Sequence, residues 1–266
     1  MDNINAKFST KDLENPSYST SSFNCFFENK WGIYNSTVYY PEGLENQPIV
    51  IFAHGFSAWK ELYIWVANSL VNQGYITLLF TVPNIFLIKP HQWSDGFKNA
   101  IDYILNEKTF SGRVNVEKIG AMGHSMGGLG ALIAASEDQR IKCIVGLAPG
   151  VLPRFLKRHK EALNIHIPVQ VQIGSKDKIV HSEHVKAFYD NLISDKKSFI
   201  EIPGGNHIQF TDKKNITVIG GSLAVLMGSD RQLVDKEPKI SFEEQQSISR
   251  NNFLAWFNDC FKLGKQ

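Results

Sequence analysis

The sequence predicts an α/β fold, with a doubly wound and mostly parallel sheet that carries antiparallel strands at its N-terminal edge. Short apolar runs alternate along the chain with longer segments of helical apolar spacing, which is typical of parallel strands joined by crossover helices. Hydrophobic residues make up 43% of the 266 residues, enough for a large core. No internal repeat divides the chain, so we expect one domain over residues 23–266, after a flexible, Ser/Thr/Asn-rich arm at residues 1–22.

The expected strands and helices follow from the local pattern of apolar residues and turn signals. Residues 48–53 form a continuous apolar run, as expected of a strand buried on both faces. The turn signal at residues 29–32 indicates that the strands on either side of it pair antiparallel. The expected strands are 23–27, 34–40, 48–53, 75–80, 119–123, 143–147, 169–173 and 199–202. The expected helices cover 62–70, 97–105, 126–135 and 184–192, and a last one ends near Phe261.

A long connection, residues 209–246, precedes the last helix. Its apolar stretch at 216–227 leaves three possibilities open: one more packed helix, a flank of the site, or a subunit contact. The oligomeric state stays open with it.

Charge and cysteine content narrow the class of partner. Lys and Arg total 28 against 26 Asp and Glu, a net charge of +2, so no basic surface for nucleic acid or anionic membrane is expected. No apolar stretch is long enough to span a bilayer. Cys25, Cys143 and Cys260 lack the spacing of a zinc site or a disulfide framework, and residues 1–22 lack the pattern of a secretory signal. These features predict a cytoplasmic protein that acts on a small molecule.

A candidate nucleophile stands in the run 123–128, which reads GHSMGG. Ser125 lies between Gly123 and Gly127, after an expected strand and at the start of an expected helix. A sharp strand-to-helix turn of this kind exposes the serine Oγ, and glycines on either side let strand and helix pass closely. The helix N-terminus offers free N–H groups to a developing negative charge.

A serine hydroxyl needs a base and an orienting carboxylate. In hydrolases with such an elbow, the acid and then the histidine follow the nucleophile along the chain. Asp177 follows the strand 169–173, and His207 follows the strand 199–202 in a glycine-rich loop. His181 and His184 fit less well, because they start a helix. Asp177 and His207 are therefore the expected partners of Ser125.

Two backbone N–H groups complete the expected chemistry. The run 54–57, HGFS, follows the first buried strand, where such a loop supplies one donor, so we assign the oxyanion hole to the N–H groups of Phe56 and Met126. The residues expected to line the substrate pocket are Phe56, Trp59, Gly150 and Ile208.

Together, residues 37–210 resemble the serine α/β-hydrolases of the carboxylesterase, cutinase and dienelactone hydrolase group. The resemblance implies the α/β-hydrolase fold and hydrolysis of carboxylic esters through an acyl-enzyme on Ser125, with no cofactor and no metal. In polyester-cleaving cutinases an aromatic residue commonly follows the Ala-Pro pair where this sequence has Gly150, so small soluble esters are the expected substrates. The same triad also serves thioesterases, peptidases and acyltransferases, and a more distant alternative is a non-catalytic ligand-binding protein of this fold.

Overall fold

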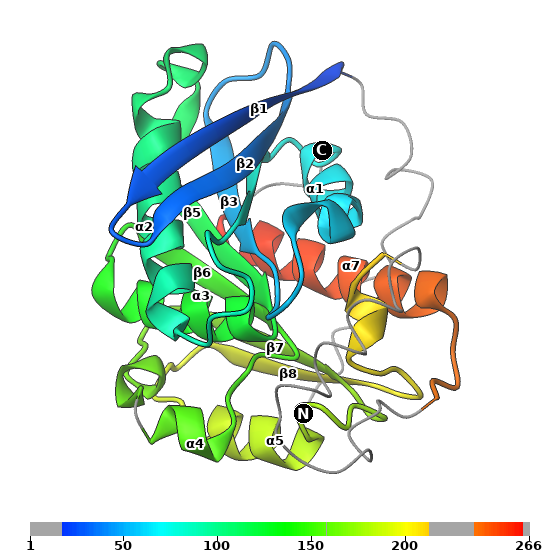
Figure 1. Cartoon of the computed structure of the whole chain (residues 1–266). Coiled ribbons are helices and arrows are strands. Elements are labelled where there is room, and N and C mark those ends of the chain that lie inside the picture. The colour runs from blue at the N-terminus through cyan, green and yellow to red at the C-terminus, as the bar shows by residue number, and fades with distance from the viewer. Residues whose placement is uncertain (1–17, 158, 213–236, 263–266) are drawn as a thin grey trace.

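The structure, a computed structural model, describes residues 18–157, 159–212 and 237–262. Within these residues one eight-stranded sheet forms the centre of the molecule, in the order β1-β2-β4-β3-β5-β6-β7-β8 (Figure 1). β1 and β2 pair antiparallel, β2 pairs antiparallel with β4, and all remaining pairs are parallel. This topology confirms the predicted fold class, including the antiparallel N-terminal edge.

The strands match the expected apolar runs. All seven residues of β3 are buried, which explains why its sequence shows no alternation of polar and apolar residues. The bounds are β1 Thr20–Asn29, β2 Gly32–Pro41, β3 Gln47–Ala53, β4 Ile76–Thr81, β5 Val114–His124, β6 Ile141–Leu147, β7 Val169–Gly174 and β8 Lys197–Ile202.

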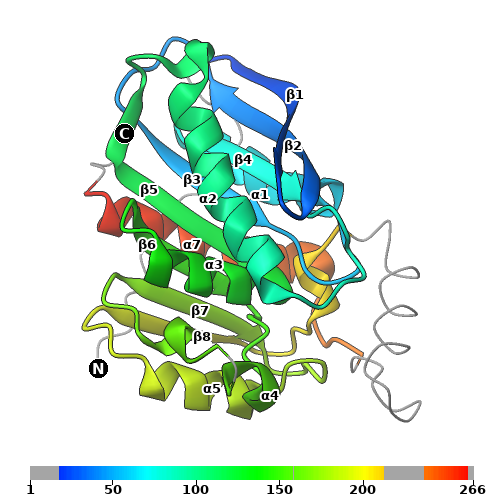
Figure 2. The same ribbon diagram turned by 60° about the vertical axis from the view of Figure 1, so that its left-hand side comes forward.

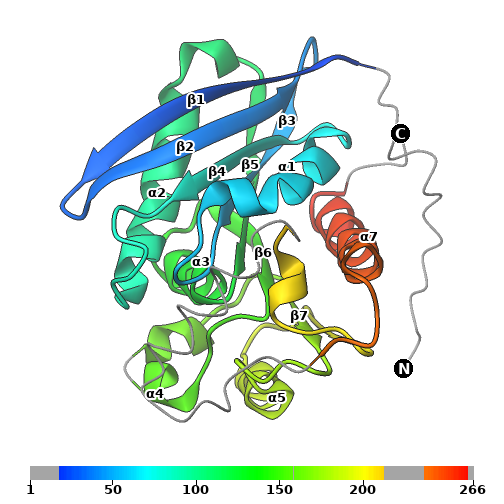
Figure 3. The ribbon, with the colours of Figure 1, turned by 45° about the vertical axis from the view of Figure 1, so that its right-hand side comes forward.

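Helices cover both faces of this sheet, with α1 and α7 on one side and α2 and α3 on the other (Figures 2 and 3). Their bounds are α1 Ile64–Val71, α2 Pro90–Asn106, α3 Met126–Glu137, α4 Pro153–Leu156, α5 Ser182–Asn191 and α7 Phe242–Cys260. Short 3-10 helices add Lys60–Tyr63, Lys108–Phe110, Lys160–Leu163 (η4) and Ile208–Phe210 (η5). None of the helices in the described ranges is long and apolar enough to cross a membrane.

Two expected boundaries shift. β1 begins at Thr20, so its first three residues belong to the sheet rather than to the arm expected over residues 1–22; residues 1–17 lie outside the described residues. The expected connection 209–246 is shorter, because η5 takes up its start and α7 begins at Phe242. Its apolar stretch at 216–227 lies outside the described residues.

Strand register brings distant loops to one edge. Ala53 at the end of β3 pairs with Gly123 near the end of β5, and Gly174 of β7 pairs with Ile202 of β8. Because these strands are parallel, the loops that follow them emerge at the same carboxyl edge, where open α/β sheets hold their sites.

Candidate active site

Ser125 occupies a strained turn between β5 and α3. Its backbone angles are φ 53° and ψ −118°, in the left-handed half of the map that side chains other than glycine rarely adopt. A Cβ on Gly127 would lie 2.2 Å from the Ala53 carbonyl oxygen, and one on Gly123 would lie 2.4 Å from the carbonyl of Gly127. The two glycines therefore allow the crossing of strand and helix that holds the serine at the sheet edge.

His207 and Asp177 form a buried pair. The ring Nδ1 of His207 lies 2.7 Å from Asp177 Oδ2, with 3% and 0% of the two side chains exposed. The other carboxylate oxygen, Oδ1, accepts the backbone N–H groups of Ile179 and Val180 at 2.9 and 2.8 Å. These two donors fix the carboxylate, and the carboxylate fixes the imidazole with its Nδ1 bound and its Nε2 on the opposite side.

The loop that carries His207 is held from two directions. A Cβ on Gly174 would lie 2.4 Å from the Gly205 carbonyl carbon, so the loops of the acid and the base cross in close contact, and Lys176 N–H donates to Gly205 O at 2.8 Å. From α7, the Gln245 amide accepts the Asn206 N–H at 2.8 Å and donates to the Asn206 carbonyl at 2.9 Å. The last described helix thus anchors the base.

His124, which precedes the nucleophile, places the ring of His207 near the elbow. The two ring centroids lie 4.5 Å apart. Burial, and then the proximity of His207, hold the pKa of His124 well below its ordinary value, so this ring stays neutral. Its Nδ1 accepts a hydrogen bond from the Tyr63 hydroxyl at 2.8 Å, and that hydroxyl accepts the Gly55 N–H at 3.3 Å. Because the His124 ring is neutral, it adds no positive charge that would oppose protonation of His207.

Two backbone N–H groups point to an oxyanion hole. Met126 is the first residue of α3, where an N–H has no acceptor in its own helix. Neither this N–H nor that of Phe56 donates to an acceptor in the described part of the chain. A Cβ on Gly55 would lie 3.1 Å from Ser125 Cβ, so the loop of Phe56 packs directly on the nucleophile.

Buried His54 fixes that loop. Its Nε2 accepts the Val82 N–H at 3.0 Å, and Ser57 N–H donates to Ile85 O at 2.9 Å. Burial lowers the pKa of His54 to about 4, which leaves Nε2 unprotonated and able to accept.

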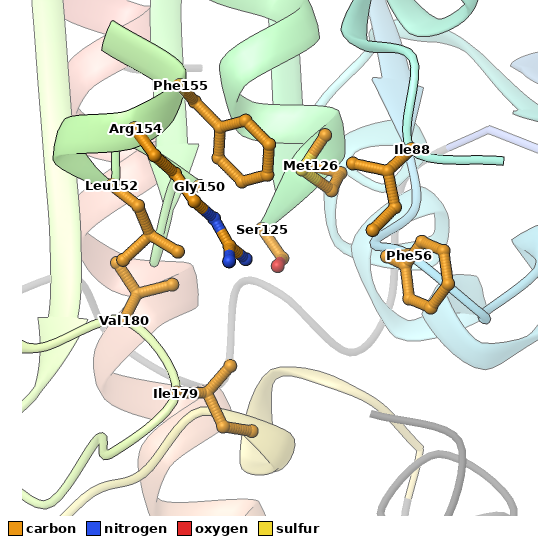
Figure 4. A pocket seen from close by; sticks show the side chains of 10 residues that line it. All are labelled: Phe56, Ile88, Ser125, Met126, Gly150, Leu152, Arg154, Phe155, Ile179 and Val180. Carbon is orange, nitrogen blue, oxygen red and sulfur yellow. The ribbon is translucent and has the colours of Figure 1, made fainter. Parts of the chain in front are cut away.

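A cavity of about 40 Å³ opens beside Ser125. Figure 4 shows its wall, which is apolar apart from Ser125 and Arg154. The lining residues are Phe56, Ile88, Ser125, Met126, Gly150, Leu152, Arg154, Phe155, Ile179 and Val180.

The cavity includes two of the four expected pocket residues. Phe56 and Gly150 line it, whereas Trp59 and Ile208 are not among its lining residues. Trp59 caps the 3-10 helix Lys60–Tyr63 in extended conformation and packs against the core, and Ile208 is buried at the start of η5.

The wall that sequence reasoning missed comes from the segment after β6. Leu152, Arg154 and Phe155 belong to α4 or directly precede it. Pro153 at the first helical position was the available signal, because proline is favoured there. Four residues are too few to show helical apolar spacing, so the segment was not predicted as a helix.

A serine elbow at the carboxyl edge of such a mixed sheet is the architecture of the serine α/β-hydrolases. The model of the PET hydrolase-like family matches residues 14–231, and the chain belongs to this family. These two results confirm the predicted resemblance.

The most similar relatives are named as ester hydrolases. A bis(hydroxyethyl) terephthalate hydrolase of Streptomyces coelicolor is 28% identical over 200 residues, which cover 73% of this chain and 62% of that protein. Cutinase 2 of Thermobifida cellulosilytica is 25% identical over 180 residues, 66% of each chain. Cutinase cut1 of Thermobifida fusca is 25% identical over 180 residues, 66% of this chain and 54% of that protein. The matched region thus spans less than two thirds of each relative, and at the level of the family these names agree with the expected carboxylic-ester hydrolysis.

Proposed function

We propose that this chain hydrolyses carboxylic esters through an acyl-enzyme on Ser125. The buried His207–Asp177 pair next to the elbow is the observation that carries the proposal, because a serine hydroxyl is a poor nucleophile without an oriented base. His207 Nε2 takes the proton as Ser125 Oγ attacks the ester carbonyl carbon. The imidazolium then returns that proton to the leaving alcohol, and water, activated by the same nitrogen, releases the acid.

The N–H groups of Phe56 and Met126 bind the oxyanion of each tetrahedral intermediate. One donor comes from a loop and the other from a helix N-terminus, so both are in place before charge develops and need little reorganisation. Such donors contribute on the order of 10²–10³ in kcat each. The mechanism needs no cofactor and no metal.

The substrate we propose is a small soluble ester with an apolar acyl part. Gly150 supports this choice, since a Cβ there would lie 3.3 Å from both Met126 Sδ and Ser125 O. A side chain at this position would reduce the space beside the nucleophile, and glycine leaves it open to the substrate. The name of the Streptomyces relative, which specifies a small aromatic diester, supports the same size class.

We also propose a cytoplasmic location. It is supported by Cys25, Cys143 and Cys260, all of which are free thiols. Burial raises the pKa of Cys143 well above its ordinary value, which keeps this thiol protonated and unreactive.

Labelling with a fluorophosphonate probe tests the nucleophile, and a panel of p-nitrophenyl esters of graded acyl length tests the reaction. Ser125→Ala should lose both labelling and turnover, by on the order of 10³-fold or more. Ser136→Ala is the matched control, because this hydroxyl donates to Ile133 O at the far end of α3. Labelling that persists in Ser125→Ala would remove Ser125 from its role. Faster cleavage of a matched thioester or amide would move the proposal to a thioesterase or a peptidase.

A further inference from the structure

Three potential metal ligands converge outside the candidate active site. His91 is the second residue of α2, whereas His159 caps η4 and Glu161 lies within it. Each of the three offers one ligand atom, and these atoms all lie within 4.8 Å of one another. The two imidazole centroids are 5.0 Å apart, and His159 Nδ1 lies 3.0 Å from Glu161 Oε1.

An ion pair alone does not account for this arrangement. The hydrogen bond between His159 and Glu161 explains those two side chains, but not the approach of His91 from a different element. The ring of His91 forms no hydrogen bond within the described ranges. All three side chains are partly buried, so the ligand atoms are accessible to an ion and yet held by their surroundings.

The donor set fits zinc. Two imidazole nitrogens and one carboxylate oxygen bind Zn²⁺ at about 2.0–2.2 Å, which places neighbouring ligand atoms of a tetrahedron roughly 3.4 Å apart. Atoms already within 4.8 Å reach that separation by small side-chain rotations. Calcium and magnesium prefer oxygen ligands and are disfavoured here. We propose that His91, His159 and Glu161 form a zinc site whose fourth position is taken by water.

The position of this site connects it to the cavity. The N–H of His159 donates to the carbonyl of Phe155 at 2.9 Å, and Phe155 lines the cavity. On the other side, Gln92 Nε2 holds the loop before α2 through Leu87 O at 2.7 Å, next to the lining residue Ile88. A bound ion would therefore cross-link two walls of the cavity, the start of α2 and the α4–η4 segment.

Zinc titration of the chelator-treated full chain by calorimetry tests the site directly, without any measurement of ester turnover. We expect one Zn²⁺ per chain, and a loss of affinity of at least about tenfold in His91→Ala and in Glu161→Gln, since each removes one of three protein ligands. Exposed His166 is the matched control, and His166→Ala should bind as wild type does. His207→Ala should also retain binding, which separates this site from zinc bound at the candidate base.

A second measurement tests whether the ion is held by the folded chain. Excess zinc should raise the Tm of the wild type, because a ligand that binds only the folded state stabilises it, and the rise should disappear in His91→Ala. Absent binding, or equal binding by wild type and both ligand variants, would overturn the zinc site. Zinc binding by the wild type without an increase in its Tm would show that the folded chain does not hold the ion, and would overturn the site. A chain that binds zinc as expected and hydrolyses no ester would refute the proposed function alone.

Discussion

Asp177→Asn replaces one carboxylate oxygen by an amide NH₂ and leaves the side-chain volume almost unchanged. Asp177 accepts three hydrogen bonds, two from the N–H groups of Ile179 and Val180 and one from His207 Nδ1. The new amide has one oxygen, so it can accept hydrogen bonds either from the two backbone N–H groups or from His207, but not from both. If its oxygen faces His207, the NH₂ group meets two buried N–H donors, and leaving these unpaired costs about 1–3 kcal/mol each.

The amide oxygen should therefore stay with the two backbone donors, and the NH₂ group should face the imidazole. His207 must then present an unprotonated Nδ1 and carry its proton on Nε2, the nitrogen that has to accept the proton of Ser125. In serine hydrolases the wrong tautomer lowers kcat on the order of 10⁴-fold, which corresponds to about 5 kcal/mol of activation free energy.

The measurement is kcat/KM for p-nitrophenyl acetate, with thermal melting as a check of the fold. Asp190→Asn is the matched control, because Asp190 is an exposed residue of α5 whose carboxylate pairs with Lys186. His207→Ala should cost at least as much as Asp177→Asn, since the histidine moves the proton. Activity of Asp177→Asn within tenfold of wild type, in a folded protein, would refute the tautomer argument and require another acid.

Three further predictions concern the elbow, a buried histidine and the cavity. Gly127→Ala places a Cβ 2.2 Å from Ala53 O, so urea unfolding should show a loss of about 1–3 kcal/mol or more, together with lost activity. His54 has a folded-state pKa of about 4, below its unfolded value of about 6.5; the unfolded chain therefore binds the extra proton between these values. The unfolding free energy should be highest above pH 6.5 and fall by about 3 kcal/mol as the pH drops to 4, and His54→Gln should flatten this dependence in urea titrations. Phe155→Ala removes part of the cavity wall, so kcat/KM should shift toward longer acyl chains in the graded ester panel, and an unchanged optimum would place the acyl group elsewhere.

Local signals predicted the centre of the site because its geometry is local. The strained turn at Ser125 needs only the glycines two residues away on either side, and the N–H of Met126 follows from its place at a helix start. Strand order then brought the loops of Asp177 and His207 to the same edge. This prediction depends on the strands being parallel, because the loops that follow parallel strands leave the sheet at the same edge.

The cavity wall and the supports of the base could not be predicted in this way. α4 is too short for a periodic pattern, and Trp59 and Ile208 show that nearness in sequence to a site residue does not place a residue in the lining of the cavity. The Gln245–Asn206 hydrogen bonds join residues 39 positions apart, and no property of either residue alone indicates the other. Nor does the spacing of His91 and His159 suggest a cluster, because only the fold brings these two rings, 68 residues apart in sequence, to within 5.0 Å of each other.

The Gln245 amide has a consequence for the order in which the protein becomes competent during synthesis. The elbow serine and both oxyanion donors lie before residue 127, and the acid and base follow by residue 207, yet the loop of the base is clamped by a helix that begins at Phe242. Until that helix docks, the loop of the base lacks both hydrogen bonds to Gln245, although Lys176 and Asp177 already contact it. The support of the base is therefore complete only after the last described helix has docked.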